Sequence, residues 1–139
     1  MESISSEKMP LVWHTLDKLE KAILTLQERT STIHSVNDFL STPVGMEKLD
    51  AACMVVIAIG ESVKNLDKLT EGKLLSTYPN IPWSRVMGAR DIMAHHYFDV
   101  DADVVFDIVK NDLNPLLQAI AFFKEQCAPV KESLLLEWF

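Results

Sequence analysis

Apolar residues recur at spacings of three and four along much of the chain, which is the pattern of amphipathic helices. The first series follows Pro10, a residue suited to a first helical turn, and predicts a helix at 10–29. Its apolar positions are Val12, Leu16, Leu19, Ile23 and Leu26. Residues 30–39 carry a weaker pattern, which fits either a short helix or a continuation of the first one.

Thr42 and Pro43 together predict the start of a long helix, because threonine caps helices well and proline fits the first helical position. We expect this helix to cover 43–69 and to be central. Its apolar positions are Leu49, Cys53, Val56, Ile57, Gly60, Val63 and Leu66. Residues 70–80 contain glycine and proline and are predicted to form a loop.

Two further helices are predicted in the second half of the chain. Pro82 should begin one of them, with apolar positions at Trp83, Val86, Met87, Ile92 and Met93. Asp101 should cap a last long helix, which Pro115 should kink or divide. The apolar stripe of that helix is Val104, Val105, Ile108, Val109, Leu113, Leu116, Leu117, Ile120 and Phe123.

These elements fit one domain covering 1–139. The chain has only four glycines, which favours helices over a turn-rich β fold. We therefore predict an all-α domain, an antiparallel bundle of about four to five main helices. Residues 1–9 should be a flexible start, whereas the apolar tail at 129–139 should dock on this subunit or on a neighbouring one.

Charge and cysteine content narrow the functional classes. The net charge of -7 opposes nonspecific attraction to nucleic acid or anionic membranes, so any nucleic-acid site must be local. The longest apolar run, Ala52 to Gly60, is too short to span a bilayer, and no membrane association is expected. Cys53 and Cys127 stand alone and are interpreted as reduced, packed thiols of a cytoplasmic protein.

The segment RVMGARDIMAHHYFDVD, residues 85–101, carries the candidate chemistry. On one regular helix, Arg90 and Tyr97 would lie about 20° apart around the axis, and Asp91 about 40° from His95. Arg90 and His95 would be about 140° apart, so both can reach one target only if the helix ends or a second copy contributes. The Phe-Asp-Val-Asp sequence that follows indicates such an end.

Arginine and histidine in this arrangement suit RNA cleavage. The guanidinium group offers a fork of donors to a phosphodiester, and imidazole exchanges protons near neutral pH. Because RNA supplies its own nucleophile, the 2′-hydroxyl, this chemistry requires no metal or other cofactor. The alternative is that Arg90 and Asp91 form surface ion pairs while His95 and Tyr97 finish a helix end and the edge of the core.

The spacing Arg90-x4-His95-x-Tyr97, with the polar Asp91 after the arginine, resembles the signature of the HEPN superfamily. The blocks PNIPW, RDIMAHHYFDVD and AIGES resemble its HepT-like toxin branch. This resemblance implies a HEPN-like homodimer whose paired motifs line a cleft. It further implies a metal-independent endoribonuclease in which Arg90 positions the phosphate of the RNA substrate and His95 acts as acid or base.

The resemblance also implies a partner. Proteins of this branch usually accompany an antitoxin that is an MNT-type nucleotidyltransferase, which neutralises the toxin and can adenylylate the motif tyrosine, here Tyr97. A different reading is a noncatalytic HEPN module in which the same cleft binds a nucleotide or a protein.

Other polar residues are further candidates for a functional site. Glu61 and Lys64 of the long helix could reach the cleft, although such residues more often form a solvated edge. The acidic residues around Asp101 lack the glycine and glutamate of a calcium loop, which favours helix capping. A metal site at His95, His96 and Asp99 lacks a fourth ligand, so no metal is assigned.

Overall fold

The computed structural model describes residues 4–94 and 101–127, and these residues form helices without any strand. The first half contains α1 (Met9–Arg29), α2 (Val36–Leu40) and α3 (Pro43–Leu69). The second half contains the 3₁₀ turn η1 (Leu75–Thr77), α4 (Trp83–Met87), α5 (Ala89–Ala94), α6 (Ala102–Asp107), the π-helical turn η2 (Ile108–Asp112) and α7 (Leu113–Gln126). The predicted all-α class is confirmed.

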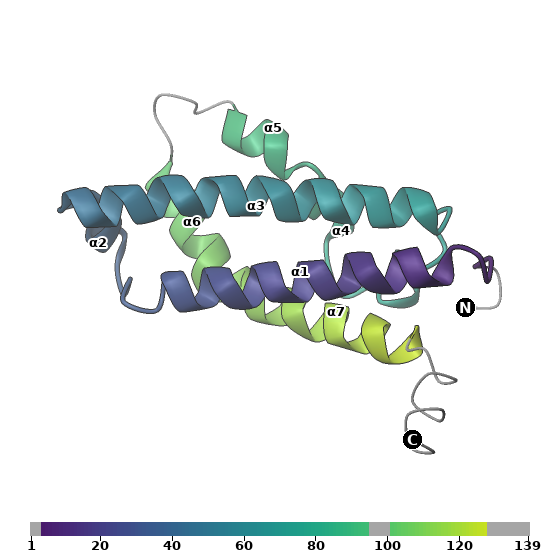
Figure 1. The fold of residues 1–139 in the computed structure, drawn as a ribbon. Coiled ribbons are helices and arrows are strands. Elements are labelled where there is room, and N and C mark those ends of the chain that lie inside the picture. The colour runs from purple at the N-terminus through teal and green to yellow at the C-terminus, as the bar shows by residue number, and fades with distance from the viewer. Residues whose placement is uncertain (1–3, 95–100, 128–139) are drawn as a thin grey trace, which may run out of the picture.

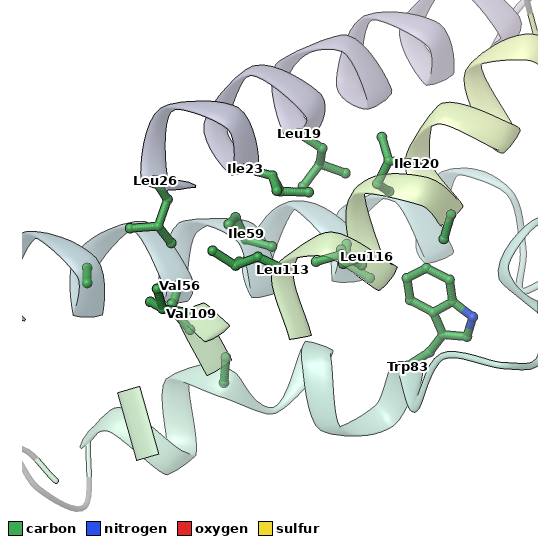
Figure 2. Close-up of a cluster of buried hydrophobic side chains, with 14 of the residues drawn as sticks. Leu19, Ile23, Leu26, Val56, Ile59, Trp83, Val109, Leu113, Leu116 and Ile120 are labelled. Atoms are coloured by element: carbon green, nitrogen blue, oxygen red, sulfur yellow. The ribbon is translucent and has the colours of Figure 1, made fainter. Parts of the chain in front are cut away.

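The two longest helices, α1 and α3, lie antiparallel, and α7 packs along α1 (Figure 1). All the apolar positions predicted for the first helix are buried. Figure 2 shows three of them, Leu19, Ile23 and Leu26, in one cluster with Val56 and Ile59 from α3 and Leu113, Leu116 and Ile120 from α7. The core therefore lies between α1, α3 and α7, and these helices form the rigid base of the fold.

Capping residues set the ends of both long helices. The Thr42 hydroxyl accepts a hydrogen bond from the amide of Gly45 at 2.9 Å, which confirms the predicted start of α3. Each helix then ends on a buried threonine, Thr30 or Thr70, whose hydroxyl donates to the carbonyl oxygen four residues earlier. The predicted bounds of 10–29 and 43–69 agree with the observed helices within one residue.

The second half departs from long regular helices at two places. The final helix begins at Ala102, with the Asp101 carboxylate accepting from the amides of Asp103 and Val104, as predicted for a cap. It is then divided by the π turn η2, which immediately precedes the helix containing Pro115. Proline cannot donate the hydrogen bond that a regular helix requires, and the wider turn accommodates this loss.

A partly buried ion cluster joins α1 to α7. The Lys124 ammonium lies 2.8 Å from the Asp17 carboxylate and 2.9 Å from that of Glu20, and it sits over the ring of Trp13. Hydrogen bonds from Lys124 and Lys21 lower the pKa of Asp17 to about 2. The lowered pKa keeps Asp17 ionised at neutral pH, so its bond to Lys124 holds the outer edge of α7 against α1.

Both cysteines are buried free thiols, as predicted. Burial, assisted by the nearby charge of Asp50, raises the pKa of Cys53 to about 11. Burial also raises the pKa of Cys127. Among the helices at 4–94 and 101–127, none combines the length and the apolar character needed to cross a membrane.

Candidate functional site

The helix predicted from Pro82 through the motif is divided at Gly88, so the expectation of one continuous helix is wrong. The helix α4 ends at Met87, Gly88 adopts φ -87° and ψ 9°, and α5 starts at Ala89. The resulting bend lets α5 lie along α3 while Trp83 remains anchored against α7. Arg90 is thus the second residue of a short new helix.

Gly60 allows the two backbones to come into contact. A Cβ atom at this position would lie 2.6 Å from the carbonyl oxygen of Val86 and 3.0 Å from Cβ of Ala89. The first distance is too short for any side chain, so α3 can approach this junction only where a glycine stands. Gly60 therefore admits the junction of α4 and α5 against α3.

Gly60→Ala is expected to destabilise the fold and to move α5 away from α3. Alanine favours a helix by about 1 kcal/mol over glycine, but the new methyl group would meet backbone that cannot rotate away, and overpacking costs about 1–3 kcal/mol. We expect a net loss of about 1 kcal/mol in the free energy of unfolding, measured by urea denaturation.

Gly88→Ala is the matched control, because a Cβ atom there would meet only the Ser84 and Arg85 carbonyl oxygens at 3.3 and 3.7 Å. A control that loses as much stability as Gly60→Ala would contradict the assignment of the backbone contact to Gly60.

The contact at Gly60 brings Glu61 and Arg90 together. The Nε atom of Arg90 donates to Oε1 of Glu61 over 2.7 Å, although the residues are 29 positions apart in the sequence. The hydrogen bond from Arg90 lowers the pKa of Glu61, and the charges of Lys64 and Arg90 act in the same direction. Glu61 is therefore ionised at neutral pH and belongs to the site.

The Arg90 side chain remains open to solvent, with 63% of its surface exposed, compared with 38% for Glu61. Its four remaining N–H groups, on the two Nη atoms, are not used by this contact and can meet a phosphate. The exposed Asp91 is not the partner of Arg90. Arg90 thus forms a surface ion pair, as the alternative interpretation supposed, and its partner is Glu61. The part of that alternative that concerns His95 and Tyr97 is not tested.

The other motif residues, His95 and Tyr97, lie outside the residues that the structure describes. His96 and Asp99 also lie outside these residues, so the structure does not test the alternative of a metal site at His95, His96 and Asp99. Within residues 4–94 and 101–127, no three His, Cys, Asp or Glu side chains gather as a metal-binding group.

A small apolar cavity of about 80 Å³ lies beneath α5, the helix that carries Arg90. Its walls come from α3, from the α4 and α5 pair, and from the start of α7, and include Ile59, Ala89 and Leu113. The charged side chains of Arg85 and Asp112 also line it. Burial raises the pKa of Asp112, as does the nearby Asp107, whereas Arg85 opposes this shift. The helix that carries Arg90 therefore rests on incompletely filled space.

The chain belongs to the ribonuclease HepT-like family. The sequence profile of that family matches residues 19–122, a range that contains α3, α5 and every motif residue. This result confirms the predicted resemblance to the HepT-like branch.

Three relatives illustrate this membership. A candidate RNase of Methanocaldococcus jannaschii is 40% identical over 53 residues, which are 38% of this chain and 40% of that protein. A candidate RNase of Caldanaerobacter subterraneus is 30% identical over 77% of this chain and 85% of its own length. A probable ribonuclease HepT of Thermococcus cleftensis is 33% identical over 73% of this chain and 84% of its own length.

The match to the first of these relatives thus spans less than half of that protein, whereas the matches to the other two span most of their length. No solved structure matches the chain significantly.

Proposed function

We propose that this protein is a metal-independent endoribonuclease toxin that cleaves RNA through Arg90 and His95 at a cleft between two subunits. The observation that carries the proposal is the position of Arg90 in a chain of the HepT-like family: its guanidinium group is exposed, and one edge is fixed against α3. A guanidinium group held in this way can bind a phosphodiester through its other edge.

The proposed reaction uses the 2′-hydroxyl of the RNA as nucleophile. His95 makes one of the two proton transfers, removing the proton of the 2′-hydroxyl or protonating the departing 5′-oxygen, and water makes the other. The 2′-oxygen bonds to phosphorus as the bond to the 5′-oxygen breaks. Arg90 stabilises the negative charge that develops on the phosphoryl oxygens. The products would carry a 2′,3′-cyclic phosphate and a 5′-hydroxyl group.

The test is cleavage of a defined RNA in the presence of EDTA, with the product ends identified by mass spectrometry. We expect cleavage to continue in EDTA and to yield cyclic phosphate ends, because no step requires a metal. Activity that disappears in EDTA and returns with Mg²⁺ would contradict the proposal. Binding of RNA or nucleotide without cleavage at any concentration would favour the noncatalytic HEPN module instead.

A homodimer is part of this proposal. Two methionines on α3 are unusually exposed, Met46 at 52% and Met54 at 70%. On an ideal helix these side chains and Glu61 lie within about 80° of one another, so the two methionines, with the exposed Asp50 between them, form a surface on the same side as the Arg90 pair. Burying that surface against a second copy would bring two motif helices close together.

The partner that we propose is an MNT-type nucleotidyltransferase acting as antitoxin in a type II-like pair. In its modifying reaction, the Tyr97 oxygen would attack the α-phosphate of ATP and release pyrophosphate. The attached adenylyl group would occupy space beside Arg90 and add a negative charge where the RNA phosphate must bind. A cytoplasmic location accords with the two buried free thiols.

A further inference from the structure

Glu61 binds the guanidinium group of Arg90 at one edge only, the one that carries Nε. Nε points along the side chain toward α3 and donates to Glu61, whereas both Nη atoms lie at the far end of the guanidinium plane. A carboxylate that binds Nε alone restricts rotation of this plane without occupying the Nη edge. Glu61 can therefore orient the group that is to bind phosphate.

The packing of α3 against the junction of α4 and α5 places Glu61 and Arg90 side by side. Gly60 meets the junction of α4 and α5 at backbone distance, with Ala89 as one of its neighbours. The next residue of α3 is Glu61, and the residue after Ala89 is Arg90. The ion pair thus lies directly beside the close contact at Gly60, which limits how far its members can separate.

Two opposing effects on RNA binding must be compared. A carboxylate beside the guanidinium group reduces its attraction for phosphate, but Arg90 is well exposed and Glu61 partly exposed, so water screens this effect. Lys64, whose charge also acts on Glu61, opposes it further. Orientation of the guanidinium plane depends on the geometry of the hydrogen bond and is lost only when the bond is broken. Orientation is therefore the larger effect.

We propose that Glu61 is a positioning residue of the ribonuclease site, one that holds Arg90 by Nε so that the Nη edge faces the scissile phosphate. The inference rests on the proposed function. Glu61 contacts neither the phosphate nor the 2′-hydroxyl and acts only through Arg90.

The experiment compares Glu61→Ala with Glu61→Gln in steady-state cleavage of a short RNA in EDTA. The glutamine amide oxygen can still accept the bond from Nε, whereas alanine removes it. We expect Glu61→Ala to lower kcat/KM about fivefold and Glu61→Gln to retain most of the wild-type value. Glu47→Gln, which removes an exposed acid from the same helix, is the charge control and should match the wild type.

A double-mutant cycle tests whether Glu61 acts through Arg90. Lysine has no Nε–H group of the guanidinium kind, so in an Arg90→Lys background Glu61→Ala should have no further effect on kcat/KM. The same fivefold loss in both backgrounds would overturn the proposal, and so would faster cleavage by both Glu61 variants, which would show that Glu61 merely repels RNA.

The Nε–H resonance of Arg90 in a ¹⁵N NMR spectrum tests the hold on Arg90 independently of cleavage. We expect its exchange with water to be slowed in the wild type and in Glu61→Gln, and to become faster in Glu61→Ala. An unchanged exchange rate in Glu61→Ala would overturn the positioning role. If the wild type shows the protected resonance but never cuts RNA, the proposed function fails while the positioning of Arg90 stands.

Discussion

His95→Ala is expected to lower the rate of RNA cleavage by about 10²–10⁴-fold, the range typical for loss of a general acid or base. The proton of the 2′-hydroxyl must be removed as the new bond to phosphorus forms, and imidazole can accept it near neutral pH because its ordinary pKa is about 6.5. Alanine cannot exchange a proton, so the loss should be seen in kcat and less in KM. The measurement is single-turnover cleavage of a defined RNA in EDTA.

His96→Ala is the matched control for this result. Adjacent side chains of a helix point about 100° apart, so the neighbouring histidine should face away from the target of His95. We expect its variant to cleave at nearly the wild-type rate. Equal losses in the two histidine variants would show that the segment tolerates no substitution and would remove the support for a specific role of His95.

Arg90→Ala is expected to lower kcat/KM by about 10²–10³-fold, comparable to the loss of one donor from a site that stabilises a developing oxyanion. The fold should be unaffected, because the Arg90 side chain is largely exposed and its described partner, Glu61, is also in contact with solvent. The melting temperature should therefore change by no more than about 2 °C. Cleavage kinetics and thermal unfolding measured on the same preparation separate the two effects.

Arg85 provides a control of equal charge. It lies on α4, five residues before Arg90, and is also exposed. Arg85→Ala removes the same long-range attraction for RNA but leaves the guanidinium group at Glu61 in place, so we expect only a small rise in KM. If the two arginine variants lose activity to the same extent, the role of Arg90 would be general attraction of RNA and not stabilisation of charge at the reacting phosphate.

The regular parts of the fold could be predicted from the sequence because local signals determine them. Pro10, together with the pair Thr42 and Pro43, sets the starts of the two long helices, and the apolar spacing identifies their buried faces. The break at Gly88 could not be predicted in the same way. Apolar residues continue in helical register on both sides of it, and the bend is required by the packing of α5 against α3, a contact between distant segments.

In the candidate site, too, the residues set by local sequence could be predicted, whereas a contact between distant segments could not. The motif is contiguous in the sequence, so Arg90 could be identified, together with the polar residue that follows it. Its partner Glu61 lies 29 residues earlier, and no local pattern connects the two. The available signal was Gly60, which precedes Glu61 in the middle of an otherwise apolar helix and marks a place where another backbone approaches.

Because a small cavity lies beneath α5, the helix that carries Arg90 packs less completely than the helices that form most of the core. Stability comes mainly from the base formed by α1, α3 and α7, whereas Arg90 stands on a six-residue helix over unfilled space. Substitutions at its exposed positions can therefore adjust the direction and reach of the guanidinium group at little cost, whereas Ala89 and Met93 of the same helix belong to the core. Under the proposed function, such substitutions would change how the guanidinium group meets a phosphate, provided that Gly60 keeps α3 close to this helix.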